Sequence, residues 1–579
     1  MPRLKIALAM SLSAAKLCAH PATYLTDRFA QPVRTLLPAD RFPAPAPATE
    51  AVDASGHRYV VGPFGVTVAL ATGERHALPG ATVLPVSKLT CVACAANGDV
   101  WFGSTQGAIR WTGGRVGYYA GRRWLPDDSV ESLECLPDGS VRLWTPGGIS
   151  HLRFPSMTLE EKAAHYEQLT DARHNRFGFV TGCRLLQPGD LSRTEHHIDD
   201  NDGLWTAMYV AAEAFRYAVT GADDAKSKAC ASLLAILSLE EKTSIPGFPA
   251  RALTHKSEAD FGRARGSEWH PTLDGEWEWK GDTSSDEMDG HYFAWPVYYD
   301  LVADEEERER LRSMVRRVTD YILDNGYYLL DLDRRPTRWG VWAPERLNDD
   351  PRWRAERGLN SLEILSYLKV AHHIAGDARY EAAYRELTAT HHYARNMLEQ
   401  KVLPGDFPGA ENNHSDDELA FLAYYGLLRY ETDPNLRALY VASLERSWQI
   451  ERAEKCPLWN FIYGAATGRP CDAEAAVGSL QEIPLDLIEW KVTNSHRADV
   501  VPAPHAGRHG EGQALVPVRW PERRLHKWNG NPYELDGGND LTEECGTFWL
   551  LPYWLGRYHG IIGDCGDLDG AGRGPEIAN

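Results

Sequence analysis

Gly281-Asp-Thr-Ser-Ser-Asp-Glu-Met-Asp-Gly-His-Tyr-Phe-Ala-Trp295 is the stretch that decides the fold, because a polar run leads without a break into an apolar helix. The same arrangement of polar loop and then helix recurs several times between residues 195 and 560. Repetition of this unit predicts a ring of helices. Their N-terminal ends would place charged and hydrogen-bonding groups around one pocket.

The composition is that of an ordinary globular protein, with 43% hydrophobic and 25% charged residues. At 579 residues the chain is longer than one core usually supports, so we expect two or more domains. The formal net charge of −20 argues against nucleic acid as a partner. Nineteen Trp and twenty-five Tyr supply flat faces that suit sugar rings, although core packing is the commoner use of an aromatic side chain.

The N-terminus resembles a short signal peptide over residues 1–20. Arg3 and Lys5 precede a ten-residue apolar run from Ile6 to Ala15, which is too short to span a bilayer. We therefore expect a periplasmic or secreted protein without a membrane span, with a cytoplasmic protein as the alternative. The ten cysteines do not settle the compartment, and the Cys91-x-x-Cys94 pair lacks the second pair that a zinc site would need.

Residues 21–156 have the pattern of a β-rich module. Short apolar or alternating runs such as Gly98 to Gly103 and Gly139 to Trp144 are bounded by turn residues. Their repeated unit resembles the strand repeats of regulator-type β-propellers. There is room for only two or three such units, so we expect a partial-propeller-like module and not a closed propeller.

From residue 157 to 579 the hydrophobic period changes to that of helices. Some stretches are apolar all round, such as Leu204 to Phe215, and others are amphipathic and charged, such as Asp304 to Arg317. Six buried and six exposed helices predict an (α/α)6 toroid as the catalytic domain. We predict helices at about 159–173, 203–220, 222–242, 285–302, 304–325, 358–375, 377–400, 414–431, 434–450, 456–466, 472–488 and 541–560.

Polar runs precede the predicted inner helices. They are Glu195 to Asp202, Gly281 to His291, Arg357 to Ser361, Glu411 to Glu418, Leu458 to Asn460 and Asp540 to Glu544. Asp199-Asp-Asn-Asp-Gly203 has the oxygen density of a calcium loop but lacks the downstream bidentate Glu. His196-His197 and His372-His373 do not have the spacing of zinc ligands on a helix. We therefore expect no metal in the site and no cofactor, with structural calcium as a minor alternative.

The segment from about 157 to 560 resembles the lyases that cleave L-rhamnose-α-1,4-D-glucuronate in arabinogalactan. Four stretches carry the resemblance: His196 to Trp205, Gly281 to Tyr292, Arg338 to Arg346 and Asn412 to Glu418. The resemblance implies an (α/α) barrel, a rhamnose-glucuronate polysaccharide as substrate, cleavage by β-elimination to a 4,5-unsaturated uronate, and a tyrosine base.

Elimination requires a neutralised carboxylate, a base for the C5 proton and an acid for the leaving oxygen. Arg338 is the residue we expect on the carboxylate, with Asn413 as a further donor. Tyr292 is the expected base, and His291 and His414 are its expected partners. The expected substrate-binding residues are Asn413, His196, His197, Asp200, Ser285, Trp339, Asn360 and Trp279.

Two other functions stay open. A glycoside hydrolase on the same fold would use two acids drawn from Asp200, Asp286, Glu287, Asp417 and Glu418. A non-catalytic glycan-binding or sensor protein would act through the β-rich module. Each site residue also has a structural interpretation: Tyr292 in the core, His414 capping or ion-pairing, Arg338 bonded to Glu345, and the acids at helix ends. The oligomeric state is not predicted.

Overall fold

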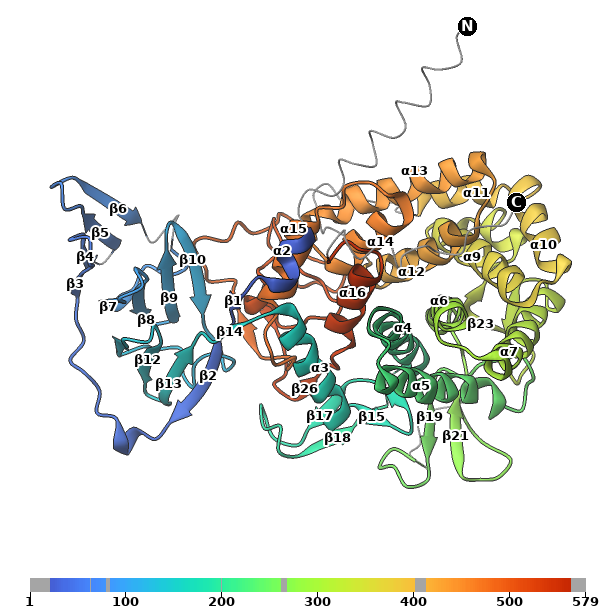
Figure 1. Cartoon of the computed structure of the whole chain (residues 1–579), viewed down its shortest axis with the longest axis horizontal. Helices are drawn as coiled ribbons and strands as arrows, with labels where there is room; N and C mark the ends of the chain where they lie inside the picture. The colour runs from blue at the N-terminus through green and yellow to red at the C-terminus, as the bar shows by residue number, and fades with distance from the viewer. Residues whose placement is uncertain are drawn as a thin grey trace, which may run out of the picture.

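The computed structural model describes residues 21–62, 64–79, 84–198, 200–261, 268–400 and 413–563 (Figure 1). The predicted signal peptide at 1–20 and Asp199 lie outside the described residues. Most strands from the first 157 residues gather at one end of the molecule, and the helices gather at the other (Figure 1).

Three four-stranded antiparallel sheets make up most of the N-terminal part, and their orders are β3-β4-β5-β6, β10-β9-β8-β7 and β11-β12-β13-β2. The strands are β2 Val33–Leu37, β3 Glu50–Val52, β4 Arg58–Gly62, β5 Gly65–Ala69, β6 Arg75–Pro79, β7 Leu89–Cys94, β8 Val100–Ser104, β9 Gly107–Thr112, β10 Arg115–Tyr119, β11 Ser132–Cys135, β12 Val141–Thr145 and β13 Gly148–Arg153. A short pair, β1 Phe29–Ala30 and β14 Ser156–Met157, closes this part.

The middle sheet is buried on both faces. Every residue of β8 is buried, and successive side chains point to opposite faces of a strand. Val100 and Phe102 belong to one apolar cluster, and Trp101 between them belongs to another. β7 contacts β3 and β4 on one side and β11 on the other. Meandering four-stranded sheets agree with the predicted strand repeats, and the partial-propeller relationship stays a proposal.

Each of the twelve predicted helical segments contains an observed helix. The helices are α2 Pro21–Thr26, α3 Leu159–Arg173, α4 Asp202–Thr220, α5 Asp223–Glu241, α6 Ser285–Leu301, α7 Glu305–Asp324, α8 Pro344–Leu347, α9 Arg357–Ala375, α10 Ala378–Ala389, α11 Tyr393–Asn396, α12 His414–Tyr430, α13 Pro434–Glu451, α14 Pro457–Thr467, α15 Ala473–Glu482 and α16 Thr547–Tyr558. The largest difference is in the predicted helix 541–560, where β26 Thr542–Glu543 precedes α16.

Six apolar helices follow one another in a closed circuit of contacts. Each of α4, α6, α9, α12, α14 and α16 packs against the next, and α16 packs against α4. Thirteen consecutive α4 residues from Asp202 to Ala214 are buried, as expected for a helix enclosed on all sides. The predicted (α/α)6 toroid requires such a circuit, and assignment to that fold class stays a proposal.

Amphipathic helices cover this circuit. On α7 the buried apolar residues Leu311, Met314, Val315, Val318 and Ile322 recur at helical spacing, while most of the other residues are charged. Short turns join such a helix to its apolar neighbour. Gly221 ends α4 in the left-handed conformation (φ 67°) two residues before α5 begins, as the predicted hairpin turn requires.

Small sheets connect the helices. They are β15 Asn175–Arg176 with β16 Phe179–Val180, β17 Cys183–Leu185 with β18 Thr194–His196 and β26, β19 Leu253–His255 with β21 Trp277–Lys280 and β20 Trp269–Pro271, β22 Tyr328–Leu330 with β23 Pro336–Val341, and β24 Val492–Thr493 with β25 Asp536–Gly537. Within the described ranges, every helix is too short or too polar to cross a membrane.

The β-rich part is joined to the helical part by long-range polar contacts. Arg123, itself buried, donates to the carbonyl of Asp486 at 3.0 Å. The indole of Trp124 donates to the carbonyl of Pro521 at 3.3 Å. The partners belong to the long segment between α15 and α16, so this segment connects the strands to the helical part.

Candidate functional site

The first turn of α6 is organised by its capping residue, Ser284. The hydroxyl of Ser284 accepts the amide of Asp286 at 3.3 Å, and the carboxylate of Glu287 accepts the amide of Ser284 at 3.2 Å. This capping box satisfies helix amides that would otherwise lack partners. Asp286 is the one residue between Thr283 and Tyr298 whose side chain stays partly exposed. Its side chain is therefore partly accessible to solvent at the helix end.

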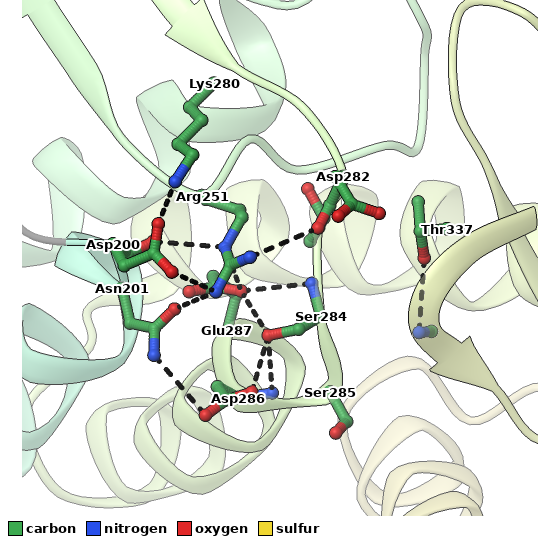
Figure 2. Close-up of polar contacts among 12 residues, drawn as sticks. Asp200, Asn201, Arg251, Lys280, Asp282, Ser284, Ser285, Asp286, Glu287 and Thr337 are labelled. Atoms are coloured by element: carbon green, nitrogen blue, oxygen red, sulfur yellow. Dashed lines mark hydrogen bonds and ion pairs between the residues drawn. The ribbon is translucent and has the colours of Figure 1, made fainter. Parts of the chain in front are cut away.

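Arg251 links the loop before α4 to the N-terminal end of α6 (Figure 2). Its guanidinium donates to the carbonyl of Asp200 at 3.1 Å and to the side chain of Asn201 at 2.5 Å. It also lies 3.6 Å from the carboxylate of Glu287. Lys280, at the end of β21, pairs with the carboxylate of Asp200. The two cations hold the loop before α4 against the start of α6.

Asn201 completes the contact between the two helix ends. Its side-chain amide donates to one carboxylate oxygen of Asp286 at 3.3 Å, and the hydroxyl of Ser284, which lies 2.6 Å from the other oxygen and 3.0 Å from Glu287, shares its one proton between the two carboxylates. Both oxygens of Asp286 are therefore oriented by neutral donors (Figure 2). Neutral hydrogen bonds orient a carboxylate and leave its charge unpaired, as a catalytic base or nucleophile requires.

Five further carboxyl groups lie within electrostatic range of Asp286. Its charge raises the pKa of each, in addition to the larger effect that burial has on every one. The five groups come from α6, α9 and α12: Glu287, Asp289, Glu363, Asp416 and Glu418. We call Asp286 and these five residues the acid cluster. Its members come from three helices of the circuit, so the N-terminal ends of these helices meet there.

Two members of the acid cluster are fully enclosed and bonded to each other. Burial raises the pKa of Glu363 to about 8, and burial also raises the pKa of Asp289 well above its usual range. Trp342 donates its indole N–H to Glu363 at 2.8 Å, and Tyr367 donates its hydroxyl to Asp289 at 2.8 Å. Two adjacent buried carboxyls cannot both ionise easily, so this pair retains a proton at neutral pH.

Asp416 is the partly exposed member on α12. Burial raises its pKa to about 7, and the charge of Glu356 at the start of α9 adds to the rise. Arg508 opposes the rise in the pKa of both Glu356 and Asp416, so its exposed guanidinium reaches this side of the cluster. An accessible carboxyl with a pKa near neutrality suits general acid catalysis.

Lys527 supplies further positive charge near the acid cluster. Its ammonium group lies 3.3 Å from a carboxylate oxygen of Glu544 and 4.4 Å from the centre of the Trp205 ring. It also opposes the rise in the pKa of the buried Glu418. Arg251, Arg508 and Lys527 therefore each oppose the rise in the pKa of one member of the acid cluster.

Several residues predicted to bind substrate lie beside this cluster. Asp200 is held by Lys280 and Arg251, and Ser285 is the first residue of α6. Asn413 caps α12 and donates its side-chain amide to Asp416. Arg338 lies next to the cluster because its amide donates to Asp282 at 2.8 Å, and its side chain is 65% exposed.

Arg338 pairs with Asp282 at 3.5 Å and not with Glu345, which instead accepts from Tyr328. The neighbouring Trp339 is 43% exposed, as a sugar-stacking residue must be. Asp282 itself has a positive φ of 51°, which is uncommon for a residue other than glycine. Strained backbone of this kind often accompanies a functional loop.

Tyr292 and His291, the predicted base and its partner, point into packed helices. The hydroxyl of Tyr292 bonds to Thr319 on α7 at 2.6 Å, and burial raises the pKa of Tyr292. Thr319 and Asp320 are the side chains that modify this rise, and neither is a cation that would stabilise a tyrosinate. His291 stacks on Trp295, and burial lowers its pKa to about 3. This placement does not favour either residue as a catalytic group.

The other predicted residues are spread more widely. His414 is buried at the start of α12 with its Nδ1 atom 3.6 Å from Glu454. Asn360 is buried and donates to the carbonyl of Val341 at 2.9 Å, and Trp279 is buried in β21. His196 and His197 are exposed at the end of β18. Asn360 and Trp279 therefore serve packing, and His414 lies beside the acidic side chains of Asp417 and Glu454.

Residues that the sequence did not single out complete the site: Arg251, Lys280, Glu363, Asp416 and Arg508. Asp416 follows Asn413 by three residues, the spacing of a capping partner, and this signal could have favoured it over Asp417. Asp417 and Glu418 are both buried, whereas Asp416 is partly exposed. Arg251 lies in a loop and Lys280 at the end of β21, and no motif links either residue to Asp200.

Among the described residues, two groups of side chains have metal-ligating atoms close together: His174, Cys183 and Glu543, and His414, Glu451 and Glu454. The described residues of the predicted calcium run, Asp200 to Gly203, do not form such a group. Asp202 pairs with Arg176, and Asp200 pairs with Lys280 and Arg251. Asp199 lies outside the described residues. These pairings with cations do not favour calcium at the run.

Comparisons with known proteins add little to this description. No protein-family model matches the chain, and no curated protein matches it. Among solved structures, the crystal structure of a sugar epimerase from a ruminal bacterium is similar over 70% of this chain and 99% of that chain, with 12% identity and a TM-score of 0.36. At this TM-score the likeness carries no argument about fold or activity.

Proposed function

We propose that this protein is a carbohydrate-active enzyme that cleaves a glycosidic bond at the acid cluster, with Asp286 and Asp416 as the reacting carboxyl groups. The observation that carries the proposal is the difference between these two side chains. Asp286 is partly exposed and oriented by two neutral donors. Asp416 is partly exposed with its pKa raised to about 7.

Hydrolysis needs a protonated carboxyl opposite an ionised one. Asp416 would protonate the leaving oxygen, because its raised pKa keeps a proton available near neutral pH. Asp286 would act on the opposite side of the sugar, either by activating water or by attacking the anomeric carbon. Glu363 and Asp289 are too deeply buried to touch a substrate. Their retained proton limits the negative charge that surrounds Asp286.

If water is removed from around the bound sugar, the interactions of Asp286 and Asp416 with the sugar become stronger. Trp339, the chain neighbour of Arg338, is exposed, and Arg338 and Arg508 offer exposed guanidinium groups near the cluster. Aromatic faces pack on sugar rings, and guanidinium groups bind carboxylates through two parallel hydrogen bonds. A polysaccharide that carries acidic sugars fits this lining.

β-Elimination from a rhamnose-α-1,4-glucuronate linkage is the second candidate function. The exposure of Arg338 favours it, because a guanidinium that neutralises the uronate carboxylate is what elimination requires. The buried hydroxyl of Tyr292 speaks against a tyrosine base at that position. An elimination at this site would therefore take its base from the acid cluster, and Asp286 is the accessible carboxylate.

We also propose that the closed circuit of α4, α6, α9, α12, α14 and α16 is the inner ring of an (α/α)6 toroid. In such a fold the acid cluster lies at one open end, where pockets form. The N-terminal sheets contribute no member of the acid cluster among the described residues. We propose that they support the segment between α15 and α16, which carries Arg508 and Lys527.

Product analysis distinguishes the two reactions. Purified protein would be incubated with rhamnosyl-glucuronate oligosaccharides and other acidic oligosaccharides in water enriched in heavy oxygen. Hydrolysis would place one heavy oxygen in a product and create no ultraviolet absorbance. Elimination would create the absorbance of a conjugated double bond without the heavy oxygen. Cleavage that is unchanged in both Asp286→Asn and Asp416→Asn would overturn the proposal for either reaction.

A further inference from the structure

A second cluster lies away from the acid cluster, where β17 meets β26. Cys183 and Glu543 are directly paired in the antiparallel register, so their side chains project on the same face of the sheet. His174, which ends α3, faces the same point. All three side chains are completely buried, with exposed fractions of 0%. The proposed reaction does not use any of them.

The distances within this cluster match a tetrahedral metal site. The Nε2 atom of His174 lies 3.3 Å from Oε2 of Glu543, and Sγ of Cys183 lies 3.7 Å from the same oxygen. Ligands at the corners of a zinc tetrahedron with bonds of about 2.0–2.3 Å lie about 3.3–3.8 Å apart. Both separations fall in that range, and the three ligand atoms all lie within 4.8 Å of one another.

The orientation of His174 is that of a metal ligand. Its Nδ1 atom is bonded to the carbonyl of Thr181 at 2.9 Å, so Nδ1 carries the proton and donates it. Nε2 is buried and, within the described residues, makes no well-aligned hydrogen bond. A ligating histidine commonly donates its other ring N–H to a backbone carbonyl, which fixes the tautomer and aims the lone pair.

The carboxylate of Glu543 is oriented by Arg173. Arg173 donates to both of its oxygens, at 2.7 and 2.8 Å. This forked pair fixes the plane of the carboxylate. Hydrogen bonds of this kind to a ligating carboxylate are a regular feature of protein metal sites.

We propose that His174, Cys183 and Glu543 bind one Zn²⁺ ion, with a water molecule as the fourth ligand. The Cys183 thiol would lose its proton to solvent as the sulfur–zinc bond forms, and the charges of thiolate and carboxylate would balance the ion. The ion would tie α3 to β17 and to β26, which directly precedes Glu544 and α16. Its role would be to stabilise this junction beside Lys527.

The test uses the full-length protein. After incubation with Zn²⁺ and removal of excess metal, elemental analysis should find about one zinc per chain. With Co²⁺ in its place, a thiolate-to-cobalt absorption band should appear in the near ultraviolet. Cys183→Ser should abolish the band and lower the zinc content. Cys456→Ser, which changes another buried thiol, should preserve both.

Wild-type protein that binds no stoichiometric zinc and shows no cobalt–thiolate band would overturn the proposal. The cluster would then be a set of polar contacts among His174, Cys183 and Glu543 that holds no metal. A band that survives in a folded Cys183→Ser variant would also overturn it. If that variant does not fold, the wild-type protein decides: its melting temperature should rise with Zn²⁺ and fall again with a chelator, and an unchanged melting temperature contradicts the site.

Discussion

The first turn of α6 and the turn that follows it differ in what their side chains can reach. Asp286, in the first turn, is partly exposed and lies within electrostatic range of carboxyl groups on α9 and α12. His291 and Tyr292, only five and six residues later, are enclosed by Trp295 and Thr319. A motif that is continuous in sequence is thus divided in space. Only its beginning belongs to the site.

Substitution of Asp286 should have the largest effect. Asp286→Asn keeps the shape and removes the charge, so kcat/KM should fall by about 10²–10⁴-fold, the usual contribution of a positioned acid or base. Steady-state kinetics on a cleaved oligosaccharide would measure it. The matched control is Asp304→Asn, which changes an acid that caps α7 at the outer surface. Equal losses in both variants would mean that the effect is structural.

Asp416 should control the alkaline side of the pH profile. Because the acid must be protonated and its pKa is raised to about 7, wild-type activity should fall as the pH rises through that value. Asp416→Asn should lower kcat by about 10²-fold or more and remove this limb of the profile. A variant that keeps the same alkaline limb would assign it to another group.

Arg251 should affect activity by holding Asn201, and through it Asp286, in position. Arg251→Lys keeps the charge but cannot bond to the carbonyl of Asp200 and the side chain of Asn201 together. Misplacement of Asp286 through Asn201 should lower kcat by up to about 10²-fold. Arg317→Lys is the matched control, because Arg317 makes a similar forked ion pair with Glu240 on the outer helices. An activity loss confined to the control would contradict the assignment.

The helices could be predicted from the sequence because each depends on its own periodicity and caps. The Ser284–Glu287 capping box and the stripe from Leu311 to Ile322 are local signals, and the structure contains both. The division into apolar and amphipathic helices was visible for the same reason. The spacing of apolar residues shows which face of a helix is buried. This face can therefore be predicted without knowing the neighbouring helix.

The site residues could not be predicted equally well, because they depend on how each helix is rotated against its neighbours. Asp416, Asp417 and Glu418 are consecutive acids that point about 100° apart around α12, and only Asp416 is partly exposed. The sequence favours Tyr292 as the base because it stands next to His291. In the structure its hydroxyl points to Thr319 on α7. Arg251 meets Asp200 across 51 residues through a loop contact without a sequence signature.

The buried pair beneath Asp286 should appear in the pH dependence of stability. The pKa of Glu363 is about 8 in the folded protein, against 4.5 for the ordinary group. Between these values the unfolded chain has released a proton that the folded chain retains. The contribution of Glu363 to stability should therefore fall as pH rises, by about 1.4 kcal/mol per pH unit. Denaturant unfolding of Glu363→Gln should show a smaller slope, and an unchanged slope would contradict the shift.

Tyr292→Phe should have the smallest effect on catalysis. Removal of the hydroxyl leaves Thr319 without its partner, so the free energy of unfolding should fall by about 1–3 kcal/mol. Chemical denaturation would measure this loss. Tyr298→Phe offers a control on the same helix, where a hydroxyl bonded to Glu307 at 2.9 Å is removed. Both variants should keep near wild-type kcat/KM.

The most direct test of the central claim is a comparison of turnover by Asp286→Asn and Tyr292→Phe on the same oligosaccharide. The claim is that the chemistry belongs to the first turn of α6. It predicts a loss of about 10²–10⁴-fold in the first variant and nearly full activity in the second. Loss of activity in a folded Tyr292→Phe variant, with activity retained in Asp286→Asn, would contradict it.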